Sequence, residues 1–320
     1  MHQEWFRIGD FAIRGYGTVL VLAFFLSLGV AVFLARSAGR KDLVKHVVDV
    51  SLYSIFGGLV GARLWHVFVF NWDYYSQHLD QIISVPVAGL SIQGGLIGGV
   101  LVAVLYCRWK KINLWEILDI CAPAMIFGQA VGRSANLLNG DGLGSPTGED
   151  FGILYPPGTN AAYEYPGQPL WPAEIWEGQI DVIIFALLLV LRLRRWPSGY
   201  IFSFYVLMYS MNRFGMEFLR GDTPDWAGLS AAQWTCVGAA VLALVFLVLR
   251  RKAPQGLGFG TQGDGKGPLS KGKKRGGGKN RAGERNEVGG KNEAGGKDED
   301  RGGKDKAGGK DEDRGKDEAG

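Results

Sequence analysis

The sequence predicts an all-α integral membrane protein of about seven transmembrane helices, with its N-terminus outside the membrane and its C-terminus in the cytoplasm. Three observations predict this fold class. Seven long apolar runs follow one another, lysine and arginine gather in alternate loops, and the composition changes abruptly after Lys252. We therefore expect a polytopic membrane domain at 1–252 and a separate tail at 253–320.

The apolar runs lie near residues 17–35, 47–70, 88–107, 114–131, 180–191, 199–218 and 231–249. Each approaches the ~20 residues that a helix needs to cross a bilayer. The run at 180–191 is short, and we extend it upstream through Glu177. A cleavable signal peptide is not expected, because the first run is long and further runs follow it.

Positive charges predict the orientation. They form four clusters, one after each odd-numbered run. Arg36, Arg40, Lys41 and Lys45 follow the first run, and Arg108, Lys110 and Lys111 follow the third. Arg192, Arg194 and Arg195 follow the fifth, and Arg250, Arg251 and Lys252 follow the seventh. The intervening loop 71–87 contains no lysine or arginine, and 133–178 contains only Arg133. Because cytoplasmic loops carry the excess of positive residues, these four clusters are predicted to lie inside.

The tail at 253–320 has a composition typical of disordered chains. It contains no aromatic residue beyond Phe259 and repeats Gly-Gly-Lys-Asp-Glu-Asp-Arg at 295–301 and 308–314. Such a segment cannot bury enough apolar surface to offset the entropy that ordering costs. We expect a disordered, low-complexity, solvated linker.

Metal and nucleic-acid chemistry are not expected. Cys107, Cys121 and Cys236 lie in apolar runs at wide spacing, which indicates core residues. The four histidines, His2, His46, His66 and His78, show no ligand spacing. No metal, cofactor or nucleic-acid partner is therefore predicted.

Several polar groups are predicted to lie in the outer third of the membrane. A rise of ~1.5 Å per residue places Arg63 ~24 Å, Arg213 ~21 Å and Glu217 ~27 Å along a ~30 Å core from the inner side. Arg133 reaches the outer boundary, and Tyr16 and Gln93 lie a few residues below it. Ionisable groups at such depth are costly and usually functional.

Structural roles are the alternative for each residue. Arg213 and Glu217 are four residues apart on one helix face, which Arg220 continues, so they can simply neutralise each other. Arg63 can bind a backbone carbonyl, and Tyr16 can belong to an interfacial aromatic belt. The common depth of these groups on separate helices favours function. A cavity with several arginines and few carboxylates suits an anion such as a phospholipid headgroup.

The segment Gly132–Thr147 is the strongest local motif. It reads Gly-Arg-Ser-Ala-Asn-Leu-Leu-Asn-Gly-Asp-Gly-Leu-Gly-Ser-Pro-Thr. Asparagines, an arginine and glycines at a helix end can direct backbone N–H groups toward an anion. The segment therefore predicts a phosphate site.

This segment also resembles the signature of the bacterial prolipoprotein diacylglyceryl transferases. The matching residues are Gly132, Arg133, Ala135, Asn136, Asn139 and Gly144. The resemblance extends over roughly residues 10–250, through Ile13–Gly17, Gly61–Leu64, Gln93–Leu96, Trp171–Glu177 and the pair Arg213 and Glu217. Three positions depart from the family pattern: Gln93 stands for a histidine, Leu137 for a phenylalanine and Asp141 for a glutamate. Glutamine cannot act as a general base near neutral pH.

The resemblance implies transfer of the diacylglyceryl group of phosphatidylglycerol to the lipobox cysteine of a prolipoprotein. A thioether forms and glycerol phosphate leaves. It implies a multi-pass protein of the bacterial inner membrane, whose site faces outward and which we expect to be monomeric, with membrane lipids around it. No cofactor is implied.

The candidate residues for this reaction fall into two groups. Catalytic candidates are Arg133, Arg213, Glu217, Tyr16, Asn136 and Asp141. Substrate-binding candidates are Arg133, Asn139, Gly144, Arg63, Gln93 and Arg220. Arg133 and Arg213 would stabilise the departing phosphate. Glu217 would orient an arginine or take the thiol proton. The alternatives are a catalytically weakened paralogue, and a lipid-binding or transport protein without chemistry, which paired inverted repeats would support.

Overall fold

The computed structural model describes residues 4–8, 11–82, 89–220, 225–226 and 228–251, and the expected tail at 253–320 lies outside them. The described part is mostly helical. A long helix covers most of each of the seven expected runs: α1 (Gly15–Ser37), α2 (Lys41–Trp65), α4 (Ile92–Lys110), α5 (Leu114–Asn139), α7 (Ala173–Leu191), α8 (Tyr200–Met216) and α9 (Ala231–Leu249).

Five of these helices are long and apolar enough to cross a membrane: α1, α2 with its continuation to Phe70, α4, α5 and α9. The other two, α7 and α8, differ for identifiable reasons. Helix α7 carries three carboxylates, Glu174, Glu177 and Asp181, and α8 has 17 residues. Large apolar side chains such as Phe33, Leu96 and Leu242 are more than 60% exposed on the helices, as lipid-facing residues are. The chain is an all-α membrane protein in its architecture.

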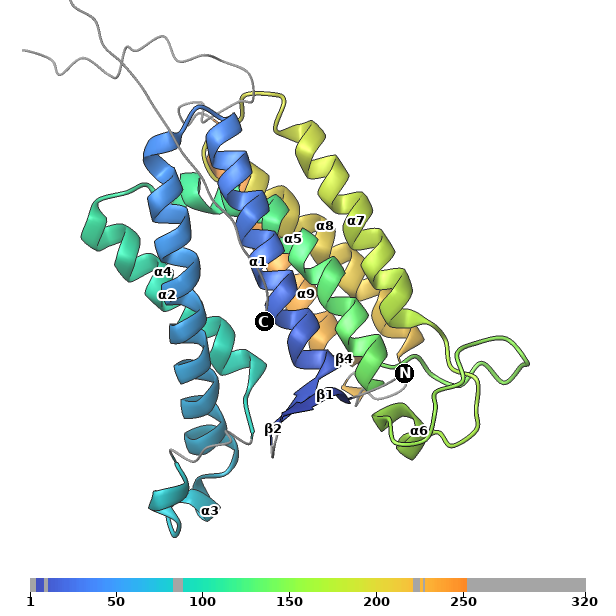
Figure 1. Cartoon of the computed structure of the whole chain (residues 1–320). Coiled ribbons are helices and arrows are strands. Elements are labelled where there is room, and N and C mark those ends of the chain that lie inside the picture. The colour runs from blue at the N-terminus through green and yellow to red at the C-terminus, as the bar shows by residue number, and fades with distance from the viewer. Residues whose placement is uncertain (1–3, 9–10, 83–88, 221–224, 227, 252–320) are drawn as a thin grey trace, which may run out of the picture. The chain divides into compact units, whose positions relative to one another are not determined.

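Short elements join these helices, and the apolar runs did not predict them. They are η1 (His66–Phe70), α3 (Trp72–Tyr75), η2 (Leu79–Gln81), α6 (Asn160–Glu164) and η3 (Glu217–Leu219). Two antiparallel hairpins pair β1 (Glu4–Ile8) with β2 (Phe11–Arg14), and β3 (Asp225–Trp226) with β4 (Leu229–Ser230). Most of these elements precede or follow the long helices at the end opposite the predicted cytoplasmic arginines (Figure 1).

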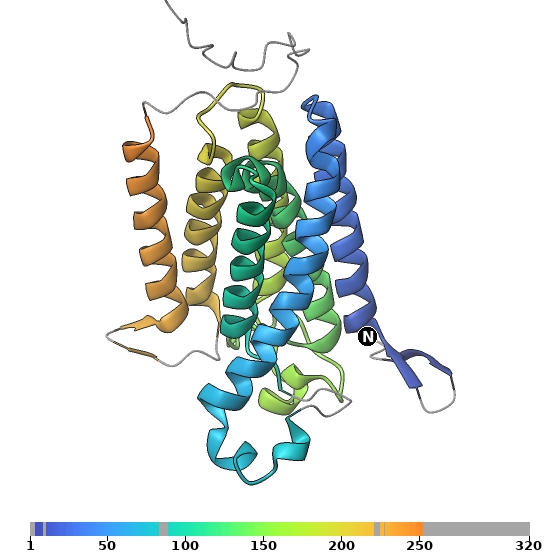
Figure 2. The same ribbon diagram turned by 90° about the vertical axis from the view of Figure 1, so that its left-hand side faces the viewer.

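Helix α5 is the centre of the packing. Helices α1, α7 and α8 all pack against it, and α9 packs on α8 (Figures 1 and 2). Helix α2 packs chiefly against α4. That contact depends on glycine, since a Cβ atom on Gly61 would collide with the carbonyl oxygen of Gly94. Close approach of helix backbones through glycine is common in membrane proteins.

Asp119 fixes the register between α5 and α8. Its carboxylate accepts hydrogen bonds from the backbone N–H groups of Gly199 (2.6 Å) and Phe202 (2.9 Å). These N–H groups at the start of α8 would otherwise lack a partner within the helix. Gly199 has φ +96°, a conformation that favours glycine. Arg133 follows Asp119 by fourteen residues and Arg213 follows Gly199 by fourteen. Because α5 and α8 run in the same direction, this anchor places both arginines ~21 Å further along, at one level.

Candidate functional site

The site is built where α5 and α8 end and α7 begins. Gly140 terminates α5 with φ +73°, and its N–H donates to the carbonyl oxygen of Asn136 (2.8 Å). This left-handed end is the usual helix stop. It places Arg133 in the last two turns of α5. Arg213 lies in the last turn of α8.

Helix α7 presents a row of buried carboxylates to its neighbours. Glu174, Glu177 and Asp181 recur at intervals of three and four residues, so they lie on one helix face. All three are at most 1% exposed. Tyr155 donates to Glu174, and Asn212 donates to Asp181 Oδ1 at 2.9 Å. The most central of the three, Glu177, is paired with arginine.

Glu177 is shared between two helices. Arg133 Nη2 from α5 pairs with Glu177 Oε1, and Arg213 Nη1 from α8 lies 3.5 Å from Glu177 Oε2. The carboxylate thus fixes both guanidinium groups at the same place. A buried carboxylate is stable only when paired and hydrogen-bonded, and two arginines on one carboxylate leave a positive charge in excess.

Glu217 continues the chain of charges on the other side of Arg213. Arg213 Nη2 lies 2.8 Å and Arg220 Nε lies 3.6 Å from Glu217 Oε2. Ser230, at the start of α9, donates its hydroxyl to Glu217 Oε1 at 2.7 Å. The five residues Arg133, Glu177, Arg213, Glu217 and Arg220, the arginine–glutamate chain, carry one net positive charge when ionised.

Arg133 and Arg213 remain accessible to a further partner. The side chains of Arg133 and Arg213 are 17% and 18% exposed, whereas the two glutamates are at most 2% exposed. Arg133 uses Nη2 for Glu177, and the described part of the chain offers no hydrogen-bond acceptor to its Nε and Nη1. Guanidinium groups placed in this way suit a phosphate, which accepts two N–H bonds at once.

The signature loop after α5 lies against the same cluster. Asp141 accepts hydrogen bonds from the side-chain amides of Asn139 and Asn160, which hold it in place. Gly142 has φ +72°, and a Cβ atom there would lie 3.0 Å from Nη1 of Arg220 and 3.5 Å from Nδ2 of Asn136. The Asn136 amide and the Arg220 guanidinium therefore both lie close to the place where Gly142 lacks a side chain.

Gly144 connects the signature loop with the start of α7. A Cβ atom there would collide with the carbonyl oxygen of Trp171, so only glycine fits. The neighbouring Ser145 donates its N–H to the carbonyl oxygen of Leu219 (2.7 Å) and accepts one from Trp171 (3.0 Å). The loop is thereby hydrogen-bonded both to the segment after α8 and to the segment before α7.

Tyr16 lies in the first turn of α1, at the same end of the helices as the signature loop (Figure 1). Its part in the reaction stays a prediction.

Arg63 and Gln93 are placed differently. Arg63, in the last turn of α2, donates to the carbonyl oxygens of Gln81 (2.7 Å), Ile82 (2.9 Å) and Gly89 (3.3 Å). This is the structural role considered as the alternative for Arg63. Gln93 is exposed and accepts a hydrogen bond from the hydroxyl of Ser91 (2.7 Å). Both hold the loop region around α2 and α4, and their predicted contact with substrate stays a prediction.

Sequence reasoning missed the residue at the centre of the chain. Glu177 served only to extend an apolar run and to match a motif, and Asp181, Asn212 and Ser230 were not considered. The signal was available, because three acidic residues within one apolar helix are as costly as the arginines that were selected by depth. Among the described residues, no group of three His, Cys, Asp or Glu side chains is placed to bind a metal ion.

A hollow of about 320 Å³ lies beside the arginine–glutamate chain. It lies between α5 and α7 and is lined by Arg133 and Glu174, by the polar Ser134 and Gln179, and by apolar residues, among them Leu137, Ile175 and Val182. Charged and apolar groups thus share one hollow, which suits an amphipathic molecule.

Comparison with known proteins is in accord with this geometry. A family model described as prolipoprotein diacylglyceryl transferase matches residues 3–249. A phosphatidylglycerol–prolipoprotein diacylglyceryl transferase from Acaryochloris marina is 32% identical over 261 residues, which is 78% of this chain and 92% of that protein. The chain is also similar to proteins of the same name from two other bacteria. The one from Symbiobacterium thermophilum is 33% identical, over 78% of this chain and 94% of that protein. The one from Listeria innocua is 32% identical, over 77% of this chain and 88% of that protein.

Proposed function

Because the chain belongs to the prolipoprotein diacylglyceryl transferase family, we propose that the arginine–glutamate chain is the site of its reaction. The protein is a multi-pass membrane transferase that moves the diacylglyceryl group of phosphatidylglycerol to prolipoproteins. The observation that supports the site is the sharing of Glu177 by Arg133 and Arg213, with donors left over on the arginines.

The proposed chemistry is a displacement at carbon. The lipobox cysteine sulfur forms a bond to the glycerol carbon that carries the phosphate, and the carbon–oxygen bond to that phosphate breaks. The products are a thioether and glycerol phosphate, and the thiol proton passes to an acceptor. The nucleophile belongs to the substrate, so the chain itself needs to supply only positioning, charge and a proton acceptor.

Arg133 and Arg213 would stabilise the phosphate as it departs. Negative charge develops on its oxygens while the carbon–oxygen bond breaks, and preformed cations in a water-poor site are most effective there. Glu177 holds the two guanidinium groups without covering them, because its own side chain is buried behind them. Arg220 would add a third donor from the side of Gly142.

Glu217 would act mainly by orienting arginines. Both of its oxygens already have partners, with Arg213 and Arg220 at Oε2 and Ser230 at Oε1. Taking the thiol proton would require breaking one of these contacts. Asp141, which binds the amides of Asn139 and Asn160, would hold the signature loop, and the Asn136 amide and Tyr16 hydroxyl would contact the headgroup.

We further propose that all seven long helices cross the bacterial inner membrane, with the N-terminus outside and the tail disordered in the cytoplasm. The buried carboxylates of α7 are paired or hydrogen-bonded, which lowers the free-energy cost of placing that helix in the membrane. The site then faces outward, where the lipobox cysteine of a secreted precursor emerges. The working unit is a monomer, since the arginine–glutamate chain is complete within one chain.

The activity is tested by purified protein with phosphatidylglycerol and a lipobox peptide. The expected product is a peptide whose mass has increased by one diacylglyceryl group, with release of glycerol phosphate. A peptide whose cysteine is replaced by serine is the matched control and should remain unmodified. Lipid binding without a modified peptide would instead support a lipid-binding protein or a weakened paralogue.

A further inference from the structure

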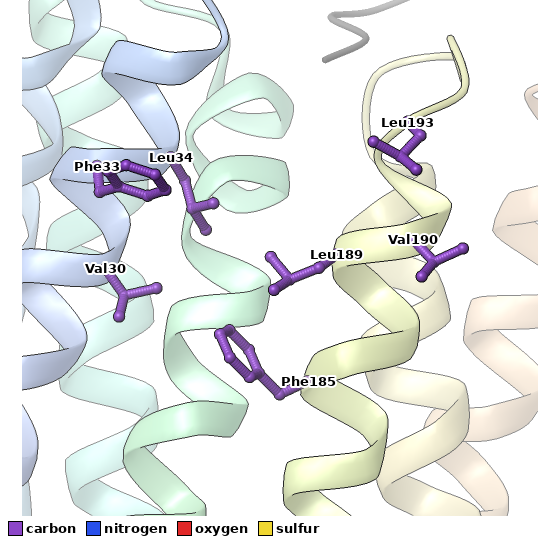
Figure 3. A pocket seen from close by; sticks show the side chains of 7 residues that line it. All are labelled: Val30, Phe33, Leu34, Phe185, Leu189, Val190 and Leu193. Carbon is purple, nitrogen blue, oxygen red and sulfur yellow. The ribbon is translucent and has the colours of Figure 1, made fainter. Parts of the chain in front are cut away.

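A second hollow lies at the opposite end of α7 from the arginine–glutamate chain. It has a volume of about 380 Å³ and is lined by Val30, Phe33, Leu34, Phe185, Leu189, Val190 and Leu193. Figure 3 shows Phe185 and Leu189 of α7 pointing toward α1, and Leu34 of α1 facing them across the gap. The lining is apolar throughout, so the hollow suits a hydrocarbon chain.

The hollow exists because α1 and α7 pack mainly on α5 and not on each other. Near the helix ends one contact does join them: the buried Arg192 donates through Nη2 to the carbonyl oxygen of Leu34 at 3.2 Å. Large side chains line the gap beside that contact. A partner helix would need small residues for close approach, which Phe33 and Phe185 do not offer.

Three exposed arginines closely follow residues that line this hollow in the sequence. Arg36 follows Leu34 by two residues on α1, and Arg194 and Arg195 directly follow Leu193 after α7. In the part of the chain that the structure describes, none of the three has an ion-pair partner.

The acidic groups at the same end are already engaged. Asp42 and Glu116 both pair with Arg40, and Asp119 accepts from the start of α8. The positive charge of the three arginines is therefore not neutralised by these carboxylates, and it lies at the same end of α1 and α7 as the apolar hollow.

We propose that this hollow binds one acyl chain of an anionic phospholipid whose phosphate lies over Arg36, Arg194 and Arg195. Basic residues beside a groove between membrane helices attract anionic headgroups, and the attraction falls off within a Debye length, about 8 Å at physiological ionic strength. A zwitterionic lipid would fill the apolar part equally well but gain little from the arginines. Charge selectivity thus separates this site from ordinary lipid contact.

This lipid site is separate from the transfer site. Leu191, the last residue of α7, follows Glu177 by fourteen residues, which is ~21 Å along the helix axis and so near the other membrane surface. The bound lipid is therefore not the donor but a lipid of the opposite leaflet. By filling the gap between α1 and α7 it stabilises the packing of both helices on α5.

The test measures lipid preference at the site by fluorescence quenching. A fluorophore is attached to Leu193→Cys, in a background whose three native cysteines are replaced by alanine, and the protein is placed in vesicles of brominated phosphatidylglycerol mixed with phosphatidylcholine. We expect stronger quenching by the anionic lipid, with a preference of roughly fivefold for each arginine that the headgroup reaches. A fluorophore on Leu242→Cys, which is exposed on α9 far from these arginines, is the control position and should show no preference.

Each arginine is replaced singly, so that the other positive residues still determine the orientation of the chain in the membrane. Arg36→Gln, Arg194→Gln and Arg195→Gln should each lower the preference several-fold, while the corresponding lysine variants keep it. Arg108→Gln, at the end of α4, is the matched control and should leave it unchanged. Val30→Phe, which fills the hollow without a change of charge, should reduce quenching by lipid brominated near the chain end. Equal quenching by both lipids at Leu193→Cys, or an unchanged preference in all three glutamine variants, would overturn the proposal.

Discussion

Arg133 on α5 and Arg213 on α8 contact opposite oxygens of a single buried carboxylate, that of Glu177. The two arginines come from distant parts of the sequence, and the Asp119 anchor between α5 and α8 brings them to the same level. The site therefore depends on two features: a shared counter-charge and a fixed helix register. Each can be removed separately.

Glu177→Gln removes the shared charge and keeps the size of the side chain. The two guanidinium groups then repel each other and lose their common position, so turnover should fall by ~10²-fold or more. Stability should also fall, because breaking a buried ion pair commonly costs about 3–5 kcal/mol. The control is Glu116→Gln, which removes a partly exposed partner of Arg40 at the other end of the helices and should keep turnover. Equal turnover in the two variants, per inserted molecule, would show that the shared carboxylate is dispensable.

Asp119→Asn tests the register. Asparagine offers one oxygen where the carboxylate accepts from both Gly199 and Phe202, so a hydrogen bond at the start of α8 is lost. The expected cost is about 1–3 kcal/mol in the free energy of unfolding. Turnover should fall as well, although Asp119 lies ~21 Å from the arginines along the helix. Asp42→Asn is the control, since that exposed carboxylate touches neither α5 nor α8. Lower stability with full turnover would show that the register is not what aligns the site.

Gln93→His should change activity only modestly, and Gln93→Ala should cost more. Gln93 accepts a hydrogen bond from Ser91, which caps the start of α4, and histidine can also accept it whereas alanine cannot. Turnover of the three forms with the lipobox peptide is the measurement. An inactive natural protein that Gln93→His activates would show that a proton-transferring histidine is required at this position.

The orientation predicts how reporter fusions behave. A reporter fused after Lys111 or Arg195 should report the cytoplasm, and one inserted at 148–165 should report the outer side, because positive residues gather in the first set of loops. An external signal from the Arg195 fusion would contradict the proposed orientation. It would also move the arginine–glutamate chain to the cytoplasmic side.

Hydrophobicity and charge were sufficient to predict the helices. Each of the seven apolar runs overlaps a long helix, and five of these helices are long and apolar enough to cross a membrane, where a helix satisfies its own backbone hydrogen bonds. Depth counting also predicted that Arg133, Arg213 and Glu217 lie near one end of the helices. The short hairpins and α6 were not predicted, since their residues have neither a long apolar run nor a strong period.

The partners of the charged residues were less predictable. Depth along a helix says nothing of which face a side chain occupies, so Arg63 was grouped with Arg213 although it binds the carbonyl oxygens of a nearby loop. Glu177 was overlooked because its helix was recognised only in part. The pairing of Arg133 with Glu177 depends on the contact between α5 and α7, which no local pattern in the sequence specifies.

Turnover per inserted molecule of Arg133→Lys and Arg213→Lys tests most directly whether these two arginines stabilise a departing phosphate. Lysine keeps the charge and the insertion of the chain but lacks the planar fork that holds two oxygens at once. We predict that each variant inserts normally and loses ~10²–10³-fold in turnover. Arg40→Lys, whose arginine pairs with Asp42 and Glu116 away from the site, should keep it. Near-normal turnover in both site variants would contradict the claim and favour a purely structural role for these arginines.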